Sequence, residues 1–186
     1  MTILQDYRDR EHWSYSSLNQ LLNICSLQWA LQRLYGLVPE FRPASMSLGS
    51  AFHRVLEWMA LNRKEGKRPN ESDARNLFDD LWERQLDEDG EVKFDEDGDA
   101  ETCGAQGRDM VACFARAIDE DEHVLHVNQT FCVPLMDSEG CTLPKPLIGE
   151  IDCVVEKLGG IILADWKTSG RRWPKVRSGP SGRAAS

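Results

Sequence analysis

GEIDCVVEKLGGIILADWKT, residues 149–168, is the most informative segment of the chain. Its runs of apolar and β-branched residues, 148–156 and 161–168, predict two strands. The segment Leu158-Gly159-Gly160 between them is typical of a hairpin turn. Because side chains alternate faces along a strand, we expect Asp165 and Lys167 on one face. The segment therefore predicts a β-hairpin with acids on both strands.

The register of this hairpin decides how its acids meet. A two-residue turn at Gly159-Gly160 would pair Asp152 with Lys167 and leave the two aspartates as diagonal neighbours. A turn one residue earlier would pair Asp152 directly with Asp165. Both registers place the two carboxylates on one face, whereas an odd loop without a bulge would separate them.

Asp152, Asp165 and Lys167 together are suited to metal-assisted chemistry on a phosphate. Two carboxylates this close repel each other unless a proton or a cation lies between them. Mg²⁺ or Mn²⁺ removes the repulsion and keeps positions open for water and a phosphate oxygen. The Lys167 ammonium would orient or help deprotonate the attacking water, or stabilise charge on the phosphate. These residues alone also fit a solvent-exposed hairpin without a catalytic role.

A helix predicted over residues 47–63 brings a further candidate ligand. Its apolar residues recur at helical spacing and form one stripe, Leu48, Ala51, Phe52, Val55, Leu56, Met59 and Ala60. His53 lies with Gly49 and Glu57 in a row along the border of this stripe. A neutral imidazole there would add a nitrogen ligand, which suits Mn²⁺ better than Mg²⁺, although a lone histidine more often only packs. Glu57 and Glu150 are weaker candidates for contacts to a metal-bound water.

Three more helices and one strand complete the predicted architecture. Apolar patterns predict helices over 17–36, 72–86 and 102–118, the first two capped by Ser17 and Ser72. A strand is expected over 123–135, ending near Pro134. The expected fold class is α/β, with a small mixed sheet flanked by helices and a helical N-terminal part.

Composition and charge are compatible with one intracellular domain. The chain has 186 residues, 41% of them hydrophobic, and no apolar run long enough for a membrane span. The net charge of -9 opposes nucleic-acid binding in general, but six basic residues and one acid follow from Ile161 onward. Residues 87–101 hold nine acids and one lysine, lack the spacing of a calcium-binding EF-hand loop, and predict a flexible acidic insertion. The polar N-terminus is unlike a secretory signal, so a cytoplasmic location and no membrane partner are expected.

Four short motifs follow one another along the chain: SYSSL at 14–18 with Cys25 downstream, LGSAFH at 48–53, GEID at 149–152 and DWKT at 165–168. The order of these motifs resembles the RecB-like exonuclease branch of the PD-(D/E)XK nuclease superfamily. The resemblance implies a restriction-endonuclease-like core within a nuclease-like domain of residues 1–169. The basic, low-complexity segment 170–186 is expected to be a disordered tail.

Carried over by position, the resemblance implies a metal site and a catalytic set. His53, Asp152 and Asp165 match the metal-binding residues, and Asp152, Asp165 and Lys167 the catalytic ones. The implied activity is hydrolysis of DNA phosphodiesters with Mg²⁺ or Mn²⁺, by an exonuclease of the recombination, repair or phage type. DNA is the implied substrate, and a second protein chain or a helicase subunit is a further predicted partner.

The sequence departs from the family pattern in two places. After Lys167 the family usually continues into a helix with a glutamine and tyrosine motif, whereas residues 171–177 read RRWPKVR. We therefore expect a clipped, frameshifted or split protein. No cysteine follows Cys153, so the iron–sulfur cluster of some relatives is not expected here. The alternative function is that of a catalytically incomplete, nuclease-like module that binds DNA or a protein.

Overall fold

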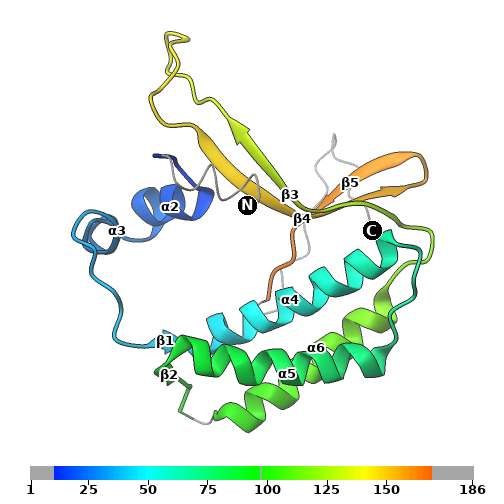
Figure 1. Cartoon of the computed structure of the whole chain (residues 1–186). Helices are drawn as coiled ribbons and strands as arrows, with labels where there is room; N and C mark the ends of the chain where they lie inside the picture. Colours follow the sequence, from blue (N-terminus) through cyan, green and yellow to red (C-terminus); the bar gives the residue numbers. More distant parts are fainter. Residues whose placement is uncertain (1–10, 97, 169–186) are drawn as a thin grey trace, which may run out of the picture.

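The computed structural model describes residues 11–96 and 98–168. Helices α4, α5 and α6 form a layer beneath a small sheet, and α2 and α3 lie to one side (Figure 1). This mixed α/β architecture confirms the expected fold class. None of the described helices has the length and apolar character needed to cross a membrane. The elements in chain order are α2 (Tyr15–Asn19), the π-helix η1 (Gln20–Ile24), α3 (Ser26–Arg33), β1 (Arg42–Pro43), α4 (Ala44–Lys64), α5 (Glu71–Asp89), β2 (Val92–Lys93), α6 (Ala100–Ala117), β3 (His123–Val133), β4 (Leu147–Lys157) and β5 (Gly160–Ala164).

Strands β3, β4 and β5 form an antiparallel sheet in that order. β3 pairs with β4 along its length, with a register shift at Leu125 that marks a β-bulge. Parallel pairing in the described residues is limited to β1 with β2 and to a bridge between Trp13 and Leu147. The central strand β4 therefore has β3 on one side and β5 on the other.

The turn between β4 and β5 is formed by Leu158 and Gly159. Both residues have positive φ, 51° and 73°, as in a type I′ turn. Lys157 pairs with Gly160 on either side of them. Of the two registers that the sequence allows, the structure has the one with the earlier turn.

The ladder of this hairpin ends one residue before its two acids would pair. Cys153 pairs with Ala164, so continuing the ladder by one residue sets Asp152 opposite Asp165. β5 ends at Ala164, however, and residues 165–168 leave the sheet. The predicted strand over 161–168 was therefore too long at its end.

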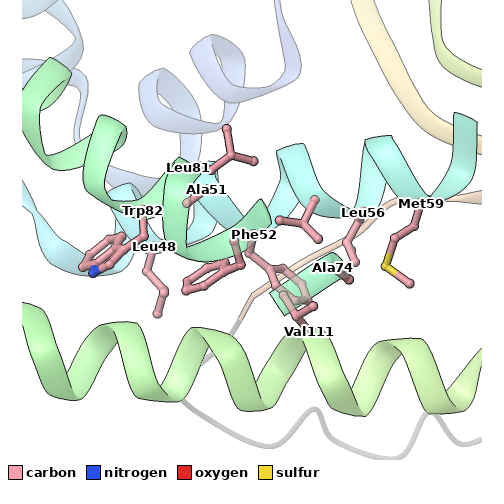
Figure 2. Close-up of a cluster of buried hydrophobic side chains, with 11 residues drawn as sticks. Leu48, Ala51, Phe52, Leu56, Met59, Ala74, Leu81, Trp82 and Val111 are labelled. Carbon is pink, nitrogen blue, oxygen red and sulfur yellow. The ribbon is translucent and has the colours of Figure 1, made fainter. Parts of the chain in front are cut away.

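Helix α4 is the centre of the hydrophobic core. All seven residues of its predicted apolar stripe are buried. Six of them pack against α5 and α6, where Trp82 and Val111 contribute to the same cluster (Figure 2). A second, smaller cluster joins Ala60 of α4 to Cys153 and Val155 of the sheet. Burial of each large apolar side chain contributes about 1.5–3 kcal/mol, so α4 is rigidly placed between the helices and the sheet.

Two predicted helix starts are wrong because a nearby side chain caps the helix instead. Ser14, not Ser17, is the N-cap of α2, and its side chain accepts a hydrogen bond from the Ser17 N–H at 3.2 Å. Asn70, not Ser72, caps α5 by accepting a hydrogen bond from the Asp73 N–H at 2.7 Å. The helix predicted over 17–36 is also divided into α2, η1 and α3.

The acidic segment 87–101 contains regular structure in its described residues. It includes the last turn of α5, the strand β2 and the start of α6. Asp99 accepts a hydrogen bond from the Thr102 N–H at 2.8 Å, and Thr102 Oγ1 accepts one from the Asp99 N–H at 2.9 Å. This capping box stabilises the start of α6. The tail predicted over 170–186 lies outside the described residues.

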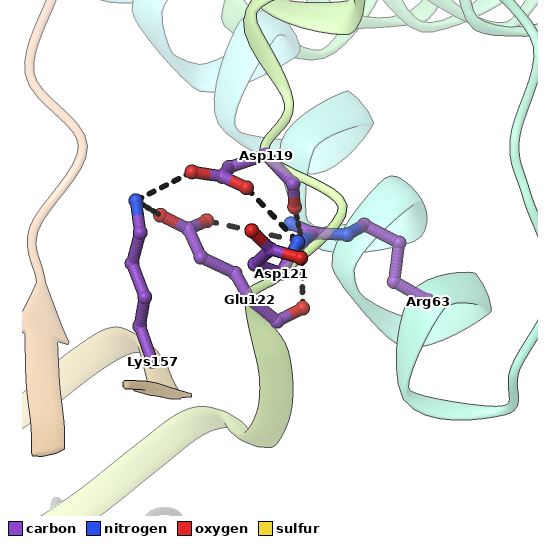
Figure 3. A network of polar contacts seen from close by, with 5 residues as sticks. All are labelled: Arg63, Asp119, Asp121, Glu122 and Lys157. Atoms are coloured by element: carbon purple, nitrogen blue, oxygen red, sulfur yellow. Dashed lines mark hydrogen bonds and ion pairs between the residues drawn. The ribbon is translucent and has the colours of Figure 1, made fainter. Parts of the chain in front are cut away.

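A network of charged side chains joins the end of α4 to the sheet (Figure 3). Arg63 donates hydrogen bonds from Nη2 to the backbone carbonyls of Asp119 and Glu122, at 2.9 and 3.0 Å. Lys157 Nζ lies 2.5 Å from Asp119 Oδ2 and 3.5 Å from Glu122 Oε1. The hydrogen bond between Lys157 and Asp119 lowers the pKa of Asp119 and raises the pKa of Lys157. The connection between α6 and β3 is thus held to both α4 and β4.

Candidate active site

Asp152 connects the sheet to α4 through its two carboxylate oxygens. Its side chain on β4 is 17% exposed. Oδ2 accepts a hydrogen bond from the backbone N–H of Trp166 at 2.6 Å. Oδ1 lies 4.0 Å from Nδ1 of His53 on α4. One oxygen therefore holds the segment that follows β5, while the other faces an imidazole and is available as a ligand.

Trp166 packs beside His53 and helps to orient it. The two rings meet edge to face, with centroids 6.2 Å apart and planes at 71°. On α6, Phe114 meets the Trp166 ring in a similar way, at 6.3 Å and 81°. Trp166 also packs against both hydrophobic clusters. The sequence predicts only an apolar position for Trp166, and no pattern in it indicates this contact with a helix far away in the chain.

Asp165 and Lys167 lie on the opposite, exposed side of the same segment. The two side chains are 59% and 56% exposed, and Lys167 Nζ lies 2.7 Å from Asp165 Oδ1. Among the described residues, no group of three His, Cys, Asp or Glu side chains lies close enough together to hold a metal ion. The structure thus brings His53 and Asp152 together and pairs Asp165 with Lys167.

The donor atoms at this position fit a hard divalent ion. Metal–ligand bonds of about 2.1 Å allow two ligands of one ion to lie up to about 4.2 Å apart. The 4.0 Å between His53 Nδ1 and Asp152 Oδ1 falls within that limit. In the structure Asp165 is paired with Lys167 instead, so its carboxylate would have to turn toward Asp152 to complete the set. An imidazole with two carboxylates is a donor set suited to Mn²⁺ as well as Mg²⁺.

Gly49 lets the segment after β5 pass close to α4. A Cβ atom at Gly49 would lie 3.1 Å from Oγ1 of Thr168, closer than ordinary van der Waals contact. Gly49 stands one turn before His53 on the helix. The glycine in the motif LGSAFH therefore allows residues 165–168 to lie beside the histidine.

A cleft of about 1260 Å³ opens next to His53 and Thr168. The first turns of α4 and the segment around Asp95 also line it. Burial and the charges of Asp95 and Asp99 raise the pKa of the Cys103 thiol in its wall. The cleft therefore lies beside His53, and Asp95 and Glu96 make one of its walls acidic.

Glu57 and Glu150 lie outside the lining of this cleft. Glu57 is half-buried on α4, and Glu150 is exposed on β4. Asp152, Asp165 and Lys167 also lie outside it, so among the candidate residues the cleft directly contacts His53 and does not decide between the others.

Comparison with known proteins identifies the family of the chain. A family model described as the PD-(D/E)XK nuclease superfamily matches residues 12–181, nearly the whole chain. Comparisons with curated proteins and with solved structures found no match. Helices packed on a small sheet, with one acid in β4 and another just after β5, are consistent with the restriction-endonuclease-like fold of that superfamily. The chain therefore belongs to the PD-(D/E)XK nuclease superfamily.

Proposed function

We propose that this protein is a divalent-metal-dependent nuclease that hydrolyses DNA phosphodiester bonds. We further propose that it is an exonuclease of the RecB-like branch, acting in recombination, repair or phage DNA metabolism. Membership of the superfamily supports the nuclease activity, and the order of the sequence motifs supports the branch. The observation that carries the proposal is the position of Asp152, with one oxygen facing His53 and the other holding the segment that bears Asp165 and Lys167.

In this proposal the side chains divide the work of hydrolysis. His53, Asp152 and Asp165 hold the ion, and Lys167 orients the attacking water or stabilises the charge on the phosphate. A bound Mg²⁺ or Mn²⁺ supplies charge neutralisation and polarises the phosphate. The water oxygen bonds to phosphorus, the bond from phosphorus to the sugar oxygen breaks, and the leaving oxygen takes up a proton.

A second candidate function is binding without cleavage. It is favoured by the ion pair between Asp165 and Lys167, at 2.7 Å, and by the absence of a three-residue ligand group within 11–96 and 98–168. In that case the domain would bind DNA or a partner protein, such as a helicase subunit, as a catalytically incomplete module.

Nuclease assays on the purified protein test both candidates. Labelled linear DNA is incubated with Mg²⁺ or Mn²⁺, with and without a chelator. We expect ion-dependent cleavage that is lost in Asp165→Ala and in Lys167→Met. The matched control is Glu156→Ala, which removes an exposed acid from the same strand as Asp152 and should keep activity.

Substrate variants then test the finer parts of the proposal. Cleavage of linear but not of closed circular DNA would support an exonuclease. RNA of the same sequence tests the preference for deoxyribose. DNA binding without cleavage under every ion would reject the nuclease and support the second candidate.

A further inference from the structure

Asn128 has a backbone conformation that a regular strand does not require. Its φ is +52° in the middle of β3. Among the described non-glycine residues, only Asn128 and Leu158 have positive φ, and Leu158 lies in the β4–β5 turn. Residues held in this region outside turns persist only where the surrounding structure imposes the conformation, and they cluster at functional sites.

Asn128 lies opposite Asp152. Its two neighbours in β3 pair with Cys153 and Ile151 of β4, so Asn128 occupies the register position opposite Asp152 in the adjacent strand. Opposed residues in antiparallel strands have Cα atoms about 4.5–5.5 Å apart. A short carboxamide at this position is therefore within reach of a ligand bound at Asp152.

The Asn128 side chain is not used within the described part of the chain. It is half-buried and has no hydrogen-bond partner among residues 11–96 and 98–168. A carboxamide offers two N–H donors and an acceptor, and those of Asn128 are not among the buried polar atoms of the described residues that lack a partner, so they are accessible to a ligand. Asp152, in contrast, is already engaged with Trp166 and faces His53. The carboxamide therefore remains free to bind a ligand.

We propose that Asn128 is a substrate-binding residue whose carboxamide donates a hydrogen bond to a phosphate oxygen of nucleic acid bound at Asp152. The inference rests on the proposed nuclease function. A neutral donor suits this place because it contacts the phosphate without competing with the carboxylates for the ion. Asparagine is also the ordinary residue, after glycine, that adopts positive φ. Asparagine at position 128 thus suits both the positive φ of the backbone and the hydrogen bond to a phosphate oxygen.

Two substitutions separate the side chain from the backbone. Asn128→Gly keeps the positive φ without strain and removes the carboxamide. Asn128→Asp keeps the shape and an acceptor, but replaces the donor with a negative charge. Leu158→Gly is the matched control, because it makes the same kind of change at the other positive-φ residue, which is 94% exposed in the turn.

The measurement is the affinity for fluorescein-labelled DNA, by fluorescence anisotropy with Ca²⁺, followed by kcat and KM with Mg²⁺. We expect both Asn128 variants to bind DNA roughly 10- to 100-fold more weakly, as for loss of a hydrogen bond to a charged group. KM should rise and kcat should change little. Leu158→Gly should match the wild type, and circular dichroism should show the same folded state in all variants.

The outcomes distinguish this inference from the proposed function. If the wild type cleaves DNA and Asn128→Gly has the same affinity and KM, only the backbone of Asn128 matters and the inference is overturned. If the wild type neither binds nor cleaves DNA, the proposed function fails and the assignment of Asn128 fails with it. If Asn128→Gly does not fold, the affinity of Asn128→Asp decides, and wild-type affinity in that variant overturns the inference.

Discussion

The two oxygens of Asp152 are expected to have separable roles, which a pair of substitutions can resolve. Asp152→Ala removes both oxygens, including the acceptor of the 2.6 Å hydrogen bond from the Trp166 N–H. Asp152→Asn keeps an oxygen that can accept this bond but removes the negative charge that faces His53. Both variants should lose metal binding and cleavage, whereas only the alanine variant should lose much stability.

The structure sets the size of this stability difference. A hydrogen bond to a charged group contributes about 1.5–3 kcal/mol, and with the carboxylate only 17% exposed the loss is weakly compensated by water. The asparagine variant keeps a neutral hydrogen bond, so its free energy of unfolding should fall by only about 1 kcal/mol. In a chain of 186 residues each kcal/mol shifts Tm by about 2–4 °C. We therefore expect Tm to fall by roughly 3–12 °C in Asp152→Ala and by about 2–4 °C in Asp152→Asn.

Thermal unfolding followed by circular dichroism in the presence of a chelator measures this difference without a contribution from bound metal. Isothermal titration with Mn²⁺ then measures the loss of metal affinity in the same samples. Glu156→Ala serves again as the control, with wild-type Tm and Mn²⁺ affinity expected. An alanine variant as stable as the wild type would refute the role of Oδ2, and an asparagine variant with undiminished Mn²⁺ affinity would refute the role of Oδ1.

Three further substitutions test the core, the charged network and the site. Gly107→Ala should lower the free energy of unfolding by about 1–3 kcal/mol, because the new Cβ would lie 1.9 Å from the Phe78 ring; a urea midpoint at or above that of the wild type would contradict this packing. Asp119→Asn should lower Tm at neutral pH. The hydrogen bond and ion pair with Lys157 lower the pKa of Asp119 from its usual 3.8. The stability that this pair adds is therefore present above pH 3.8 and is lost as the pH falls through the lower pKa of Asp119 in the folded protein. A Tm deficit of Asp119→Asn that persists in acid would argue against the ion pair. Trp166→Leu should weaken Mn²⁺ binding about tenfold or more by releasing the neighbouring imidazole, and calorimetry showing unchanged affinity would exclude an orienting role.

The local elements, and the faces on which several candidate residues lie, followed from the sequence. The stripe on α4 has a period of 3.6 residues, and all seven of its apolar positions are buried. Alternation along the hairpin likewise predicted that Asp165 and Lys167 share one face, and the two side chains form an ion pair. Such patterns are readable because each depends only on neighbours in the chain and on which side faces the core.

Caps and element ends were less predictable. Several polar side chains near Asn70 are able to accept hydrogen bonds from the free N–H groups at the start of α5. The local path of the chain decides which of them becomes the cap. The end of β5 at Ala164 has a similar origin, because Trp166 packs against α4 and draws the segment out of the sheet. Strand propensity alone does not contain this long-range contact.

Periodicity and residue chemistry are sufficient to show which residues alternate, which side of each element is apolar, and which acids, histidine and lysine are available for chemistry. Three-dimensional packing was needed to show that the turn lies at Leu158-Gly159 and that His53 faces Asp152. It also showed that Asn128 in β3 occupies the position opposite Asp152 in the adjacent strand β4. The reason is that periodicity specifies a face but not the partner on that face. Register and contacts between distant elements depend on how the whole core packs, and one residue of shift in a turn changes every pair along the strands.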